Sequence, residues 1–235
     1  METIALLLHL QDLDGRIRNL QSKIARKEEE IHHLRQVVET AQKDLESTKM
    51  ALEKAKVALA HKELELKDTE EKLKTTKGKL YSGEITSSKE LAQWEKSMEK
   101  LEATKNSLEE AVLLEMEKLE LMQKTFQEKS QAVNTQREKA FQSIALMEEE
   151  LKGWQENLEI LKREREKIIT QIDTNVISVY LDLNKKYTNP VVVLQDETCS
   201  GCHLSVPTTV AKSVRKQEEL VRCPNCGRFL YRKTS

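Results

Sequence analysis

The chain has 235 residues, of which 34% are charged and only 4% are aromatic, and its formal net charge is −1. This balance gives no overall attraction to nucleic acid, and so few aromatic residues argue against a conventional globular core. Long Lys-, Glu- and Leu-rich sequence with little Gly or Pro is typical of long helices and coiled coils. All three prolines follow Tyr187. We therefore expect one elongated helical element and then one small domain.

The first ten residues, METIALLLHL, contain a short apolar run. This run lacks the cationic leader and small-residue cleavage site of a signal peptide. No window approaches the ~18 apolar residues of a membrane span. We expect a soluble, cytoplasmic protein, and in that compartment paired cysteines favour metal binding over disulfides.

Residues 10–80 carry an aliphatic side chain at every seventh position, which predicts one helix of a coiled coil. These positions are Leu10, Ile17, Ile24, Ile31, Val38, Leu45, Leu52, Leu59, Leu66, Leu73 and Leu80. Gly78 and Gly83 then weaken the helix, and Ser87 with Glu90 forms a capping box that starts the next one. The tip of a helical hairpin is therefore predicted near residues 81–86.

The second helix repeats the seven-residue rule from Leu91 to Ala140, and a change of phase near residues 136–144 predicts a stutter. Antiparallel pairing of the two patterns predicts a register with Leu66 opposite Leu101 and Ile17 opposite Leu151. The hairpin is assigned to residues 1–186, and its second helix runs on to about Lys186.

Residues 166–186 have no partner in this register, although they carry an apolar stripe. The stripe consists of Ile168, Ile169, Ile172, Val176, Ile177, Val179, Tyr180 and Leu183. An exposed stripe of this size usually marks an interface. Its cover is the tail domain, a second copy of the chain, or another protein.

The tail, residues 190–235, contains two CxxC pairs that are separated by twenty residues. This spacing is a strong signal for one tetrahedral zinc ion, held here by Cys199, Cys202, Cys223 and Cys226. Four thiolates leave no open position, so the site is expected to be structural. VVVLQ and RFLYR are predicted strands, and residues 208–219 a short helix. His203 is a bystander, and redox chemistry is the lesser alternative.

Three segments resemble a family of bacterial coiled-coil proteins with a C-terminal four-cysteine zinc ribbon: LYSGEITSSKEL, CSGCHLSVP and VRCPNCGRFLY. Members are non-enzymatic adaptors or chaperones of flagellar or type III secretion systems, and a chlamydial type III secretion member is expected to be similar. They are described as binding the sigma-54 factor of RNA polymerase and export components, and one flagellar member also binds a transcript. The resemblance implies the same four zinc ligands and a partner surface on the ribbon and the adjoining helix end.

The first hypothesis is therefore a protein-binding adaptor, which also allows a homodimer. The second is an RNA-binding ribbon acting in gene regulation, with Phe229 and Tyr231 stacking on bases. Against it, the tail has only seven Lys/Arg to four Asp/Glu, and thiolates offset that excess. No nucleophile constellation or phosphate loop indicates an enzyme. The candidate partner contacts are Ile172, Val176, Val179, Tyr180, Arg215, Arg228, Phe229 and Tyr231.

Overall fold

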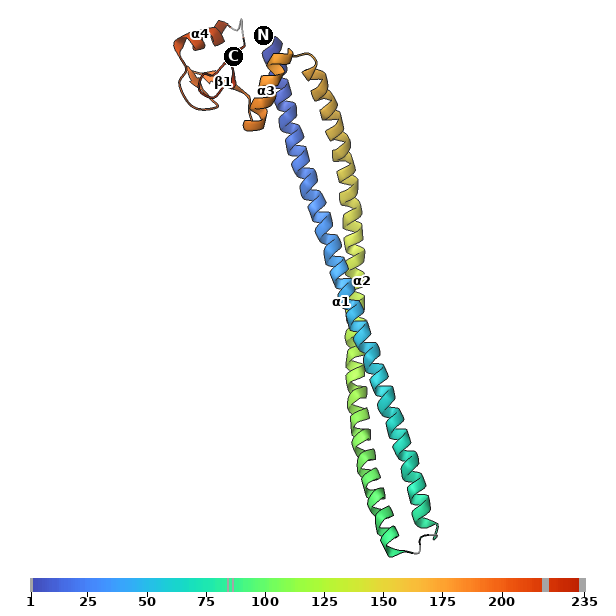
Figure 1. Ribbon diagram of the computed structural model, residues 1–235. Helices are drawn as coiled ribbons and strands as arrows, with labels where there is room; N and C mark the ends of the chain where they lie inside the picture. The colour runs from blue at the N-terminus through green and yellow to red at the C-terminus, as the bar shows by residue number, and fades with distance from the viewer. Residues whose placement is uncertain (1, 84, 86, 217–219, 233–235) are drawn as a thin grey trace. The chain divides into compact units, whose positions relative to one another are not determined.

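The computed structural model describes the chain except for residues 1, 84, 86, 217–219 and 233–235. Its elements are α1 (Glu2–Tyr81), α2 (Ser88–Ile169), α3 (Thr174–Lys186), β1 (Val191–Gln195), β2 (Thr198–Cys199), α4 (Thr208–Lys216), β3 (Val221–Arg222) and β4 (Phe229–Tyr231). They form two compact units (Figure 1): unit 1 contains residues 1–32 and 144–235, and unit 2 contains residues 33–143. The predicted class, a coiled-coil helical hairpin with a small ribbon of short strands and one helix, is confirmed.

Unit 2 consists of one stretch of α1 paired antiparallel with one stretch of α2. The predicted heptad positions Leu52, Leu59 and Leu73 are buried, as is Val112 across the seam. Gly83, at the predicted tip, has the positive φ of 78° that a tight turn requires. The residues at positions 84 and 86, which belong to the predicted tip, lie outside the described residues.

The predicted register of the two helices is wrong. Lys62 pairs with Glu115 at 3.2 Å, whereas the predicted register would place it against Lys105. Lys77 pairs with Glu102 at 2.7 Å, also further along α2 than predicted. A seven-residue repeat is matched almost equally well when one helix slides by a heptad, so the apolar pattern alone does not determine the register.

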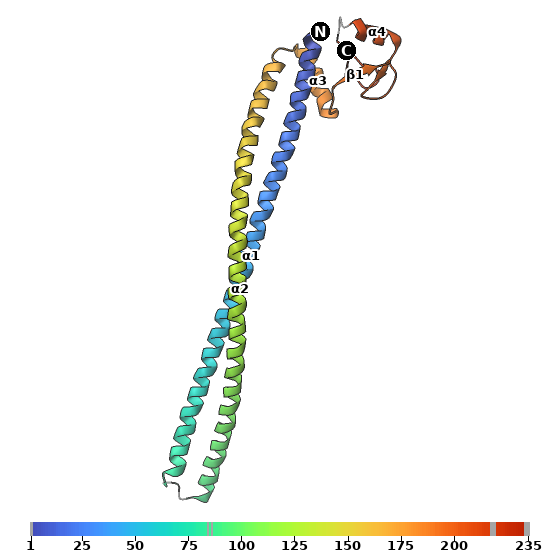
Figure 2. The ribbon, with the colours of Figure 1, turned by 180° about the vertical axis from the view of Figure 1, so that it is seen from behind.

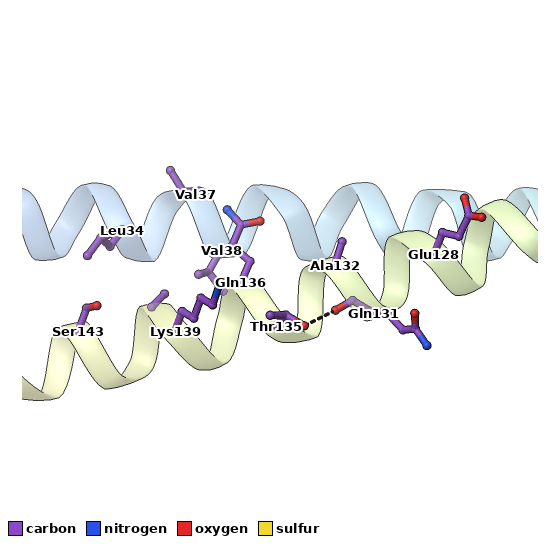
Figure 3. A pocket seen from close by; sticks show the side chains of 11 residues that line it. Leu34, Val37, Val38, Glu128, Gln131, Ala132, Thr135, Gln136, Lys139 and Ser143 are labelled. Atoms are coloured by element: carbon purple, nitrogen blue, oxygen red, sulfur yellow. Dashed lines mark hydrogen bonds between the residues drawn. The ribbon is translucent and has the colours of Figure 1, made fainter.

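An open groove of about 720 Å³ lies along unit 2 next to the predicted stutter. Figure 3 shows Leu34, Val37 and Val38 of α1 above the α2 segment that carries Ala132 and Thr135. The small side chains on α2 leave the seam incompletely filled at this level. The groove therefore coincides with the segment in which the heptad phase of α2 changes.

The prediction that the second helix continues to Lys186 is wrong, because α2 ends at Ile169. Residues 170–172 make tight backbone hydrogen bonds, including Ile172 N–H to Ile169 C=O at 3.2 Å. Asp173 then caps α3, and its carboxylate accepts the N–H of Asn175 at 2.9 Å. Figures 1 and 2 show α3 beside the first turns of α1 in both views. Residues 174–186 therefore do find a partner in the first helix.

This return of α3 covers the apolar stripe. Tyr180 is 0% exposed and Ile172 is 7% exposed. The buried core around them also takes side chains from α1, β1 and β4, and consists of Leu7, Leu10, Ile172, Ile177, Tyr180, Leu183, Val191 and Phe229. Of the covers considered from the sequence, the tail domain is therefore present, together with the start of α1.

The ribbon contains a four-stranded sheet in the order β2-β1-β4-β3. The two predicted strands are confirmed, and β1 pairs parallel with β4, with Val191 aligned with Phe229. The predicted short helix is α4, which ends at Lys216, and its predicted end at 217–219 lies outside the described residues. Val192, Ala211 and Leu230 form a second core with the cysteines. The sheet therefore lies between two cores of unit 1. One is the core around Tyr180, and the other is the core that contains the cysteines.

Candidate metal centre

The four tail cysteines converge on one point. Their sulfur atoms all lie within 4.8 Å of one another. Cys199 Sγ is 3.9 Å from Cys226 Sγ, and Cys202 Sγ is 3.8 Å from Cys223 Sγ. A tetrahedron with Zn–S bonds of about 2.3 Å has S–S edges of about 3.8 Å. The sulfurs therefore fit one zinc ion, and His203 is not part of this ligand cluster.

The two knuckles have the same backbone geometry. The N–H of the residue after the second cysteine donates to the C=O of the first: His203 to Cys199 and Gly227 to Cys223, both at 2.8 Å. Both donors have positive φ, 61° for His203 and 76° for Gly227. In the second knuckle this residue is a glycine, whereas in the first knuckle it is His203, and Gly201 does not have a positive φ.

Gly201 instead makes room for an arginine. A Cβ atom at Gly201 would lie 2.8 Å from Cδ and Nη1 of Arg228. The guanidinium of Arg228 stacks on the Tyr187 ring, 3.7 Å from its centroid. This stack joins the second knuckle to the residue that follows α3.

The environment of the sulfurs is uneven. Burial raises the pKa of the Cys199 thiol to about 12. Burial also acts to raise the pKa of Cys226, but the backbone N–H of Arg228 and neighbouring side chains lower it to about 7. Zinc requires thiolates, and so the bound cation must compensate for the burial of Cys199. A site closed by four sulfurs holds the ribbon together and offers no position for a substrate.

Gly227→Ala is expected to weaken zinc binding roughly tenfold, because an alanine with positive φ costs about 1–2 kcal/mol. His203→Gly is the matched variant in the first knuckle, because it places a glycine, which adopts positive φ without strain, where His203 now has that conformation. Competition with a chromophoric chelator measures both affinities. If both substitutions weakened zinc binding equally, the positive φ of these residues would not be what limits the zinc affinity.

A buried polar network, which the sequence did not reveal, holds the ribbon end of unit 1 together. Asp14 is 4% exposed. Its carboxylate accepts hydrogen bonds from Arg165 Nε at 2.6 Å, Tyr180 Oη at 2.9 Å and Asn184 Nδ2 at 2.9 Å. Burial and the adjacent carboxylate raise the pKa of the Tyr180 phenol, which therefore stays protonated as a donor. The network joins α1, α2 and α3.

Two further contacts extend this network to the ribbon. Arg18 donates to Asn184 Oδ1 and to the Thr188 carbonyl, both at 2.9 Å. The N–H of Val191, the first residue of β1, donates to Gln11 Oε1 at 2.7 Å. In the sequence, Asp14, Arg18 and Gln11 cannot be distinguished from the many exposed polar residues of α1.

The structure changes the candidate partner surface. Ile172, Tyr180 and Phe229 are core residues, so the prediction that they contact a partner is wrong. Val176, Val179 and Tyr231 are partly buried against the same core. Arg215, the one of the eight that is well exposed, makes an ion pair with Glu197 at 3.6 Å. Arg228 is half-buried and stacked on Tyr187.

Comparisons with known families agree with this architecture. Residues 10–188 match the model of the CT398-like coiled-coil hairpin domain. Residues 198–230 match the model of a C4-type zinc ribbon domain. A search of curated proteins finds no significant match. Among the described residues, no helix is both long and apolar enough to cross a membrane.

Three solved structures share the fold at low sequence identity. CT398 from Chlamydia trachomatis is 20% identical with a TM-score of 0.87, covering 99% of this chain and 98% of the other. A Mycobacterium smegmatis protein is 18% identical with a TM-score of 0.76, covering 99% and 98%. The HP0958 protein from Helicobacter pylori is 19% identical with a TM-score of 0.57, covering 100% and 98%. These similarities support the fold alone.

Proposed function

The chain belongs to the CT398-like coiled-coil hairpin family, and we propose that it is a non-enzymatic adaptor that binds other proteins through its ribbon. The proposed partners are the sigma-54 factor and export components of a flagellar or type III secretion system. This choice follows the family resemblance of the tip and the two knuckles. The proposed site of action is cytoplasmic.

The observation that carries the proposal is an exposed corner of the ribbon at the first knuckle. Leu204 is 54% exposed there. Arg215 approaches the same corner, because its partner Glu197 also accepts the N–H of Val206 at 2.8 Å. An apolar side chain bordered by charge is the usual composition of a protein-binding surface. We call Leu204 and Arg215 the ribbon corner.

The metal centre supports a binding role over a catalytic one. Its four sulfurs complete a tetrahedral site, and so zinc would stabilise the ribbon and not activate water. The shared core and the Asp14 network then hold the ribbon firmly on the end of the hairpin. A rigidly held surface loses little conformational entropy when it binds.

The RNA-binding alternative has less support. Phe229, a proposed stacking residue, is 3% exposed. Arg228 is already stacked on Tyr187, and Arg222 donates to the Gly227 carbonyl at 2.9 Å. These contacts leave fewer side chains for bases and phosphates than the sequence suggested.

The test is an affinity pull-down from native lysate with the full chain, with and without RNase. Leu204→Glu is expected to reduce recovery of sigma-54 factor and export components at least tenfold, because it places a charge at the centre of the ribbon corner. Leu146→Glu is the matched control, since Leu146 is 66% exposed on α2. Mass spectrometry and titration of purified sigma-54 factor measure the effect.

A chain that ends at residue 186, and so lacks the ribbon, is not a suitable control. Removing the ribbon would expose the core around Tyr180 to solvent. Equal recovery with Leu204→Glu would contradict the ribbon corner as the binding surface. If RNase abolished the recovery of the partner proteins, RNA binding would become the preferred function.

A further inference from the structure

Arg228 connects both knuckles of the metal centre with the end of α3. Its carbonyl accepts the N–H of Cys223 at 2.8 Å, which fixes its backbone in the second knuckle. Its side chain crosses to the first knuckle, where a Cβ atom on Gly201 would lie 2.8 Å from its Cδ and Nη1 atoms. Its guanidinium lies over the Tyr187 ring, with Cζ 3.7 Å from the ring centroid. Two separate segments of unit 1 therefore hold this side chain in place.

The guanidinium of Arg228 contains a buried donor that the protein does not pair. Its Nε atom is buried and has no hydrogen-bond partner among the described residues. None of the ion pairs in the described part of the chain involves Arg228 either. A buried donor without an acceptor destabilises a fold unless its surroundings compensate for it. The position of this cation therefore calls for a source of negative charge nearby.

The loaded metal centre supplies that negative charge. Four thiolates carry more negative charge than one Zn²⁺ ion neutralises, so the site is anionic when zinc is bound. Cys226 lies two residues before Arg228, and Cys202 directly follows Gly201, against which the guanidinium lies. A fixed cation beside a partly buried thiolate favours the charged form of the sulfur, which is the form that binds zinc.

We propose that Arg228 stabilises the zinc-bound thiolates by its charge, and that Tyr187 and Gly201 hold its guanidinium where it does so. Tyr187 forms the C-cap of α3, and its N–H donates to the Leu183 carbonyl at 2.8 Å. The ring on which the guanidinium rests is thus fixed by the helix end. The zinc affinity of the ribbon therefore depends in part on α3. This inference concerns the metal centre and holds whatever partner the ribbon binds.

A purely structural role for Arg228 is the alternative. Arginine often buries its aliphatic stem while its charged group remains in water, and such a side chain contributes by packing. The buried Nε of Arg228 argues against this role, because an apolar side chain of similar length would fill the same space without an unpaired donor. Gly201 also leaves room for guanidinium atoms and not only for the stem.

Zinc affinity of the full chain, measured by competition with a chromophoric chelator, tests the charge. Arg228→Met keeps the stem but removes the charge, and is expected to weaken zinc binding roughly tenfold. Arg228→Lys keeps the charge without the planar group, and should recover part of the lost affinity. Arg232→Met is the matched control, since it removes the same charge from an exposed position of the ribbon. It should change the affinity less than about twofold.

Cobalt substitution separates the effect of charge from the effect of packing. Co²⁺ occupies tetrahedral thiolate sites and gives thiolate-to-metal charge-transfer bands in the near ultraviolet. A cation beside the sulfurs stabilises their electrons, so Arg228→Met should shift these bands to lower energy. Arg228→Lys should shift them less, and Arg232→Met not at all. A side chain that acts only by packing would leave the band energies unchanged at saturating Co²⁺.

Substitutions at Tyr187 test the contribution of α3. Tyr187→Leu removes the ring and should weaken zinc binding a few-fold, whereas Tyr187→Phe keeps the ring face and should have no effect. In the Arg228→Met background, Tyr187→Leu should add nothing, because Tyr187 acts through Arg228. If Arg228→Met does not fold at saturating zinc, the comparison of Leu with Phe at position 187 still decides the matter.

Three results would overturn the proposal. One is a zinc affinity that Arg228→Met leaves unchanged, or that Arg232→Met lowers equally. Another is a loss of affinity without any shift of the charge-transfer bands, which would leave Arg228 with a packing role alone. The third is a Tyr187→Leu variant that binds zinc as tightly as Tyr187→Phe, because the end of α3 would then contribute nothing to the metal centre.

Discussion

Cys223→Ser is expected to abolish stoichiometric zinc binding and unfold the ribbon, while α1 and α2 remain helical. Cys223 is 2% exposed and lies in the ribbon core with Leu230 and Val192. A structural zinc site contributes on the order of 10 kcal/mol, which a ribbon of this size cannot replace with apolar burial. Metal analysis reports the zinc content, and amide NMR signals of the ribbon report its fold.

The matched control is His203→Asn, because His203 adjoins a ligand but is not one, and Asn also tolerates its positive φ. This variant should keep one zinc ion and a folded ribbon. A Cys223→Ser protein that retains one zinc ion with native ribbon signals would show that three sulfurs suffice. Far-UV circular dichroism should change little, since most of the helix belongs to α1 and α2.

Asp14→Ala is expected to destabilise the packing of α3 on α1 by about 3 kcal/mol. The substitution leaves Arg165 without its buried carboxylate and leaves the Tyr180 hydroxyl without its acceptor. Removing one partner of a buried ion pair typically costs about 3–5 kcal/mol. Hydrogen exchange of the α3 amides should accelerate by roughly two decades if this part of unit 1 opens locally.

Asp12→Ala is the matched control for Asp14. Asp12 has the same charge on the same helix, but its side chain is 66% exposed and 3.8 Å from Arg16. Its removal should change exchange at α3 only slightly. Equal protection of α3 in the Asp14 and Asp12 variants would mean that the apolar core alone holds α3 in place.

These two substitutions address different parts of one functional arrangement. Zinc folds the ribbon, and the Asp14 network with the shared core places it against α1 and α3. The ribbon is therefore not a separate module on a flexible linker. If the adaptor proposal holds, Asp14→Ala should weaken partner binding even though Asp14 is buried.

The sequence by itself determined the features that depend on local spacing. Two CxxC pairs place four sulfurs around one ion because each knuckle is a tight local turn, and the structure confirms this cluster. The seven-residue repeat decided which face of α1 points inward, since Leu52 and Leu59 are buried as the pattern requires. The strands VVVLQ and RFLYR were also evident, because apolar runs near turns favour strands.

Some missed features did leave a local signal. The end of α2 could have been found from Asp173, which is a favoured helix N-cap, followed by the amphipathic run of α3. The break went unnoticed because the apolar stripe continues through it without interruption. Similarly, His203 in the first knuckle aligns with Gly227 in the second, and this alignment indicates its positive φ.

Other features only the tertiary structure could decide. The heptad pattern matches several registers, and the choice depends on pairs such as Lys62 with Glu115. The apolar stripe indicated that residues 166–186 must be covered, but not that Leu7 and Leu10 would cover them. Asp14 is buried because Arg165 and Tyr180, 151 and 166 residues away in the chain, reach it. Local spacing determines which side of an element faces inward, whereas the partner on that side depends on contacts between distant segments.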